Sequence, residues 1–153
     1  MPISSVIQNS AKADLLRAGT NFNTSGGTPA GHAFKIALYT NSTTIDTTTT
    51  AYGGPTNEVS GTGYSSGGNA LTNTGVGTTT VTSFTDFSDT SWTSASFTAR
   101  GCLIYNTASI TGLTANRAVC SITFGGDKTV SSGTFTIQFP TNDSSSAIIR
   151  LTS

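Results

Sequence analysis

Charged residues are scarce in this chain of 153 residues: Asp, Glu, Lys and Arg make up 9% of it, and its net charge is zero. Without a basic field, it lacks the long-range attraction by which proteins gather nucleic acid or anionic membrane surfaces. No run of 18 apolar residues is present, so no segment is predicted to span a membrane. The start, MPISSVIQNSAKADLLRAG, lacks the features of a signal peptide, and we expect the chain to be made and kept in the cytoplasm.

Histidine and cysteine are also scarce. One histidine, His32, and two cysteines, Cys102 and Cys120, do not make a zinc site, and no cofactor motif is present. Each cysteine lies in an apolar run (GCLIY and AVCSITF), where a thiol behaves as a small hydrophobic side chain. Because cytoplasmic thiols stay reduced, we expect two buried free thiols rather than a disulfide.

Serine and threonine are abundant and together make up roughly a third of the chain. Threonine favours strands because its branched Cβ packs well on a pleated surface. The apolar residues are gathered into short runs, and the high net charge of a typical disordered chain is missing. The composition therefore predicts one folded, mostly β domain.

The first 19 residues are predicted to form an N-terminal helical arm. Ser4 or Ser5 is placed to cap the helix, and Gly19 to end it. A short helix at a chain end is marginal alone and needs a surface, which is either its own domain or another protein. The apolar stripe recurs at the helical i, i+4 spacing: Ile3, Ile7, Ala11 and Leu15.

Residues 20–153 are predicted to form a single antiparallel β-sandwich or jelly-roll domain. In FKIALYT, alternate apolar residues mark one face of a strand, and in CLIY both faces are apolar, as in a central strand. GGDK at 125–128 has the composition of a hairpin turn. We expect shared faces for three sets of side chains: Phe34, Ile36 and Leu38; Ala118, Cys120, Ile122 and Phe124; Phe135, Ile137 and Phe139. The remaining predicted strands are NEVS, GNALTN, TTTVTSFTDF, SFTARGCLIYN, AVCSITF, GTFTIQFP and AIIRLT.

Motifs for chemistry are missing. The glycine-rich stretch NEVSGTGYSSGGNALTN at 57–73 does not lead into a helix, so it predicts turns between strands rather than a phosphate site. His32 lies in a Gly-Pro loop without a G-x-S-x-G elbow, and a solvated or strand-capping imidazole is favoured over a catalytic base. Asp86 and Asp89 lie in DFSD, an ordinary turn composition. We predict that the chain is not an enzyme.

Five segments, in order along nearly the whole chain, resemble a family of small virion proteins of tailed bacteriophages. These segments are DLLRAGTNF, FKIALYT, NEVSGTGYSSGGNALTN, SWTSASFTARGCLIYN and ITFGGDKTVSSGTFTIQFPTNDSSSAIIRL. The resemblance implies a structural protein of the virion that is assembled in the host cytoplasm. Proteins of this general kind include capsid decoration, or cement, proteins as well as tail and fibre components.

Decoration of the capsid surface is the function that we favour. In that role we expect the major capsid protein to be the partner, and we expect a homotrimer, because a trimer on a local threefold axis contacts three subunits at once and its weak contacts add up. The alternative is a tail, baseplate or fibre module that recognises host glycans, with Tyr52, Tyr64 and Trp92 as platforms, although Trp92 and Phe97 are more typical of a core. A cell-wall hydrolase is a third hypothesis. The residues that we expect to dock on a partner are Ile3, Val6, Ile7, Leu15 and Leu16.

Overall fold

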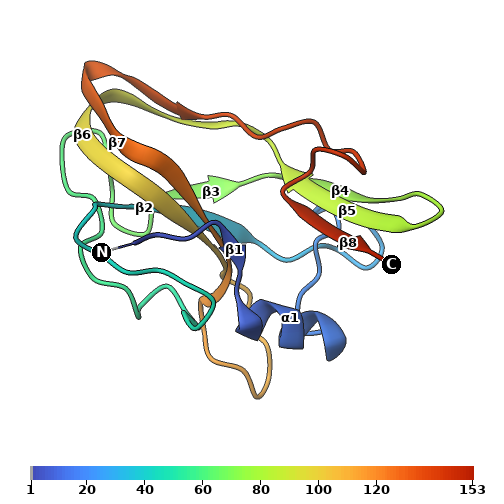
Figure 1. The fold of residues 1–153 in the computed structure, drawn as a ribbon. Coiled ribbons are helices and arrows are strands. Elements are labelled where there is room, and N and C mark those ends of the chain that lie inside the picture. Colours follow the sequence, from blue (N-terminus) through green and yellow to red (C-terminus); the bar gives the residue numbers. More distant parts are fainter. Residues whose placement is uncertain (1) are drawn as a thin grey trace.

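The computed structural model describes residues 2–153 and consists of two antiparallel β-sheets and one short helix (Figure 1). This confirms the predicted all-β sandwich with a small helix. The five-stranded sheet has the order β1 (Val6–Ile7), β7 (Arg117–Ile137), β6 (Thr90–Asn106), β2 (Phe34–Tyr39) and β3 (Asn69–Leu71). The three-stranded sheet has the order β4 (Asn73–Thr78), β5 (Thr82–Phe87) and β8 (Ile149–Thr152).

The two long strands β6 and β7, of 17 and 21 residues, form a ribbon that bends sharply and returns over the five-stranded sheet (Figure 1). The pairing passes from Ala99–Lys128 to Gly101–Thr123, so that Arg100 alone faces residues 124–127. The prediction of a hairpin turn at GGDK was therefore wrong: this segment is a wide bulge within one strand. Gly125, at φ 73°, supplies the left-handed conformation that the bulge needs.

The central strands bury both of their faces, as their apolar pattern predicts. On β2, Phe34, Ile36 and Leu38 face the main core, whereas Ala37 and Tyr39 face a second, smaller cluster. The CLIY segment of β6 divides in the same way: Cys102 and Ile104 belong to the main core, and Leu103 and Tyr105 to the second cluster. Trp92 and Phe97 are core residues, 3% and 6% exposed.

The expected common face of β7 holds only in part. Ala118 lies in the second cluster, whereas Val119 and Cys120 belong to the main core and Ile122 and Phe124 pack against it. The reason is a register shift: Tyr105 pairs with Ala118 but Ile104 pairs with Cys120, which leaves Val119 as an extra residue. Such a bulge reverses the faces on one side of it. Phe135, Ile137 and Phe139 pack together against the main core, as expected.

The N-terminal helix is shorter than predicted. Helix α1 spans Asn9–Leu16, with Gln8 at its N-cap, and Val6–Ile7 form a strand instead of a helical turn. The edge of β7 decides this difference, because Val6 and Ile7 pair with Ser121 and Cys120 of that strand. Ser4 and Ser5 cap nothing: the Ser4 carbonyl accepts a hydrogen bond from the Ser121 hydroxyl, and Ser5 Oγ accepts one from the Thr123 amide.

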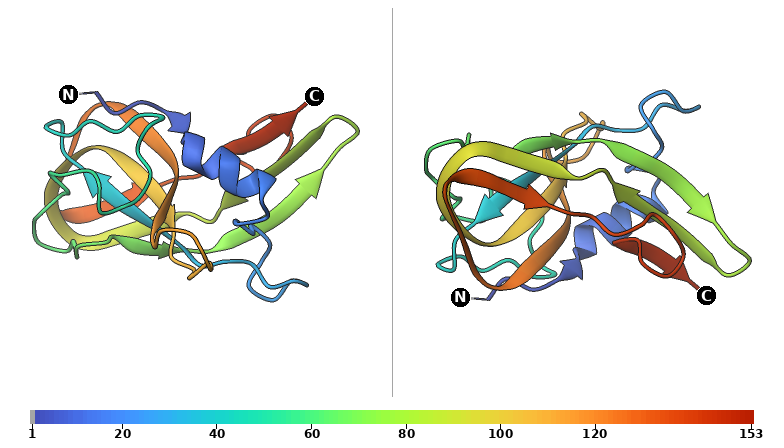
Figure 2. Two further views of the ribbon diagram at one scale, coloured as in Figure 1. Left: turned by 90° about the horizontal axis from the view of Figure 1, so that it is seen from below. Right: turned by 90° about the horizontal axis from the view of Figure 1, so that it is seen from above.

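Residues 2–19 are thus an integral part of the domain rather than a projecting arm; Met1 lies outside the described residues. Helix α1 lies under the end of the five-stranded sheet, next to β8 (Figures 1 and 2). A buried ion pair joins it to β7, since Asp14 accepts two hydrogen bonds from Arg117, at 2.7 and 2.9 Å. The side chain of Asp14 is 1% exposed.

Candidate functional site

The groups considered for catalysis all hold backbone or loop structure. His32 Nδ1 accepts the Asn21 amide at 3.4 Å and lies 2.9 Å from Asn106 Nδ2. Asp86 is fully buried and accepts the amides of Phe87 and Ile148, and burial raises the pKa of its carboxyl group. Within residues 2–153, no three His, Cys, Asp or Glu side chains gather where they could hold a metal ion.

The glycine-rich stretch at 57–73 is organised around one carboxylate, which sequence reasoning missed. Glu58 accepts four hydrogen bonds of 2.7–2.9 Å, from the hydroxyls of Tyr52, Tyr64 and Ser66 and from the amide of Gly67. These contacts close the loop against β2, where the Leu38 amide donates to the Tyr64 hydroxyl at 2.9 Å. With four donors engaged, Glu58 acts as the internal anchor of the loop.

The aromatic residues considered as glycan platforms do not form an exposed surface. Trp92 is 3% exposed and packs edge-on against Phe97 and Phe135. Tyr64 stacks on Trp92 at 6.0 Å, and its hydroxyl donates to Glu58. Tyr52 stacks on Tyr105 at 4.6 Å. A sugar ring requires a free aromatic face; Trp92 is buried, and Tyr64 and Tyr52 are partly buried and each have a neighbouring ring stacked on one face.

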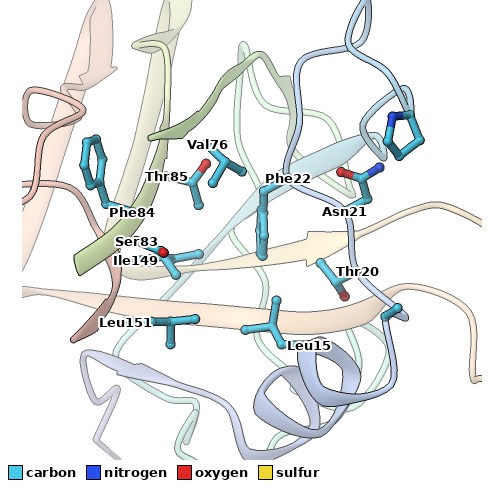
Figure 3. Close-up of a pocket in the computed structure, with 12 residues that line it drawn as sticks. Leu15, Thr20, Asn21, Phe22, Val76, Ser83, Phe84, Thr85, Ile149 and Leu151 are labelled. Carbon is cyan, nitrogen blue, oxygen red and sulfur yellow. The ribbon is translucent and has the colours of Figure 1, made fainter. Parts of the chain in front are cut away.

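One groove lies between the three-stranded sheet on one side and α1 with the loop that follows it on the other (Figure 3). We call it the helix groove; its volume is about 380 Å³. No Asp, Glu, Lys, Arg or His of the described chain lines it. Its lining residues are Leu15, Ala18, Thr20, Asn21, Phe22, Pro29, Val76, Ser83, Phe84, Thr85, Ile149 and Leu151.

The sheet side of the helix groove follows from strand register. Val76 lies opposite Thr85 and Thr85 opposite Ile149, and two residues further along Ser83 lies opposite Leu151. Side chains two apart share a face, so these residues form one surface that points into the groove (Figure 3). Among the described residues, the large apolar side chains that are mostly exposed are Leu16, Val76, Val81 and Leu151, and all of them belong to α1 or to the hairpin and edge of this sheet.

Another groove, of about 550 Å³, opens between the two halves of the bent strand β7. We call it the β7 groove. Ten residues line it: Ile122, Phe124, Lys128, Phe135, Thr136, Ile137, Gln138, Phe139, Pro140 and Ile148. Most are half-buried apolar side chains that pack on the main core, so the groove is an opening into that core.

The structure separates the five residues expected to dock on a partner. Ile3 is 6% exposed and lies in the second core cluster, and Ile7 packs against the main core. Val6 is half-buried in β1. Leu15 lines the helix groove, and Leu16 beside it is 91% exposed. Of the five, only Leu15 lines an open apolar groove.

Val76, Val81 and Leu151 were not among the expected docking residues. The alternation in IIRLT places Ile149 and Leu151 on one face, and this signal was available in the sequence. The pairing that brings Val76 beside them crosses two ladders and leaves no local pattern.

Both cysteines are buried and free, as predicted. Burial raises the pKa of the Cys102 thiol to about 12 and that of the Cys120 thiol further. Across residues 2–153, no helix has the length and apolar character needed to cross a membrane. The chain matches no protein-family model, no curated protein and no solved structure.

Proposed function

We propose that this protein is a non-enzymatic structural component of a bacteriophage virion, which decorates the capsid surface as a homotrimer bound to the major capsid protein. The resemblance to small virion proteins supports a place in a virion, and the helix groove is the surface that we propose to bind the capsid. The single observation that carries the proposal is the apolar lining of the helix groove, where Val76 and Leu151 are 56% and 55% exposed. Exposed apolar residues gathered at a groove are typical of a surface that a partner covers.

The proposed mechanism is binding linkage. A ligand that binds only the assembled shell stabilises that shell in proportion to its occupancy and affinity. A trimer that contacts several capsid subunits multiplies weak single contacts into tight overall binding. Because no ionisable group of the described chain lines the helix groove, the contact is apolar, and we expect it to survive 1 M NaCl, where the Debye length falls to about 3 Å.

The test uses the full chain and capsids of the source virus stripped of this protein. The double variant Val76→Thr, Leu151→Asn removes apolar surface from the groove without touching the core. We expect it to bind capsids about tenfold more weakly in co-sedimentation, since about 1.4 kcal/mol corresponds to tenfold. Arg150→Gln is the matched control, because Arg150 lies between Ile149 and Leu151 and points to the opposite face of β8.

Immunogold labelling of intact virions then locates the protein. Label spread over the head supports decoration, whereas label confined to the tail refutes it. Equal binding by the wild-type chain and the double variant would show that the helix groove is not the contact. The glycan-binding alternative is the weaker one, because Trp92 is buried and Tyr52 and Tyr64 are partly buried, each stacked on a neighbouring ring.

A further inference from the structure

The returning half of β7 has an open edge. In this half, Phe135, Thr136 and Ile137 pair with Trp92, Ser91 and Thr90 of β6. On its other edge, β7 pairs within residues 2–153 only near its start, with Ala51 at Arg117 and with β1 at Cys120 and Ser121. In an antiparallel strand, every second residue directs its N–H and C=O groups to each edge. The segment 133–137 therefore presents unpaired backbone groups along its outer edge.

This edge carries little protection against strand addition. Natural edge strands are usually blocked by charged side chains, prolines or bulges. From Thr129 to Phe139 there is no charged residue, and Pro140 follows the strand rather than interrupting it. The left-handed Ser132, at φ 48°, disturbs only the beginning of the returning half. The outer edge of the stretch from Gly133 to Ile137 is consequently open to a further strand.

The β7 groove lies beside this edge and completes a binding surface. Phe135, Ile137 and Phe139 point into it from the returning half, and Phe124 and Ile148 face them. The returning half of the ribbon consists of β6 and β7 alone and lies over the rest of the five-stranded sheet (Figure 1). A third strand on the edge of the ribbon would place every second side chain over the opening, where apolar side chains would be buried.

The charge at the rim of the groove indicates which kind of side chain the added strand should carry. Lys128 is the one ionisable residue of the described chain that lines the groove. No ion pair or hydrogen bond within residues 2–153 engages its ammonium group, whereas the neighbouring Asp127 is held by Arg100 at 2.7 Å and by Asn41 at 3.0 Å. A free cation beside an otherwise apolar groove favours an acidic group on the segment that enters it.

We propose that the open edge of β7 and the β7 groove bind an extended segment of a partner protein. Backbone hydrogen bonds to residues 133–137 would supply part of the affinity, and apolar side chains at alternate positions would fill the groove. An acidic side chain at the end of the segment nearest the bend would meet Lys128. This site is separate from the helix groove and does not depend on the proposed role in a virion.

Strand addition is tested with synthetic peptides and the isotopically labelled full chain. The probe is an eight-residue peptide of alternating threonine and valine with a glutamate at its amino or carboxyl end. At saturation, we expect amide exchange at the outer edge of 133–137 to slow by about tenfold or more. Methylating the peptide amides along one edge should abolish binding, and methylating those along the other should not. Equal effects of the two methylated peptides, or protection at the edge of β3 or β4 instead, would overturn the proposal.

Charge selection is tested with Lys128→Glu. We expect this variant to bind the glutamate peptide about two- to fivefold more weakly, and to prefer a peptide with lysine in that place, because rim ion pairs are worth little. Lys12→Glu makes the same charge change at an exposed position of α1 and should leave both affinities unchanged. Two other results would refute the proposal. Decanoate, an apolar chain without backbone amides, could bind the groove without slowing amide exchange at 133–137. Self-association of the chain could protect the same amides in the absence of peptide. Neither experiment uses capsids, so the outcome is separable from that of the proposed function.

Discussion

Breaking the ion pair between Asp14 and Arg117 tests how the N-terminal segment is held to the sheets. Asp14 Oδ2 accepts from Arg117 Nε at 2.7 Å, and Asp14 Oδ1 accepts from Arg117 Nη2 at 2.9 Å. The two side chains are 1% and 13% exposed, so the pair is almost completely removed from water. Arg17, by contrast, is 57% exposed and lies 3.7 Å from Asp14 Oδ1.

The variant Asp14→Asn keeps the shape of the side chain and removes its charge. It leaves the guanidinium of Arg117 buried without a counter-charge, and removing one partner of a buried pair costs about 3–5 kcal/mol. This is a large part of the about 5–15 kcal/mol by which a typical domain is stable. The exposed pair is worth at most about 1 kcal/mol, so Arg17→Ala should cost no more than that.

Urea unfolding followed by tryptophan fluorescence measures both changes, since Trp92 is the sole tryptophan and is buried. The double variant Asp14→Leu, Arg117→Met removes both charges and should recover most of the loss, because apolar replacements of buried pairs are often neutral or stabilising. The reasoning fails if Asp14→Asn costs no more than Arg17→Ala. A double variant as unstable as Asp14→Asn would show that hydrogen-bond geometry, rather than the stranded charge, sets the cost.

Two further predictions concern the core and the loop at 57–73. The thiols of Cys102 and Cys120 have pKa values raised by burial, so the native protein should react with iodoacetamide at pH 8 far more slowly than the protein in urea. Because these pKa values are higher in the folded chain than in the unfolded one, the stability that the neutral thiols contribute is complete below about pH 9 and is lost as the pH rises toward 12. A urea midpoint that stays constant from pH 8 to pH 11 would contradict this. Gly68 has φ 67°, and a Cβ there would collide with the Ile36 carbonyl oxygen, so Gly68→Ala should cost about 3 kcal/mol or more. Gly26→Ala, in open space, should change the midpoint little, and equal midpoints for the two variants would refute the argument.

Much of the fold could be predicted because strand patterns are local. The alternation in FKIALYT assigned Phe34, Ile36 and Leu38 to one face, and the doubly apolar CLIY placed β6 at the centre of a sheet. A period of two follows from the geometry of the extended backbone and needs no knowledge of the partner strand. Burial of the two thiols followed from their apolar surroundings in the same way.

The errors occurred where the partner strand decides the outcome. The spacing of Ile3, Ile7, Ala11 and Leu15 satisfies a helix, yet Val6 and Ile7 pair with the start of β7 and the helix begins only at Asn9. Similarly, the extra Val119 moves Ala118 to the opposite face, because register depends on where β6 meets β7. Glycines at 125–126 suit both a turn and a bulge, and only the pairing on either side distinguishes the two.

The sequence by itself determined the β class, the faces of the central strands, the free thiols and the scarcity of charge. Tertiary structure alone decided the register of β6 with β7, the strand before α1, and both grooves. The helix groove brings Leu15 and Phe22 against Val76 and Leu151, which are far apart in the chain. Local patterns report the conformation and the exposed face of one segment, whereas a surface made from several segments depends on hydrogen-bond register between them, and no single segment encodes that register.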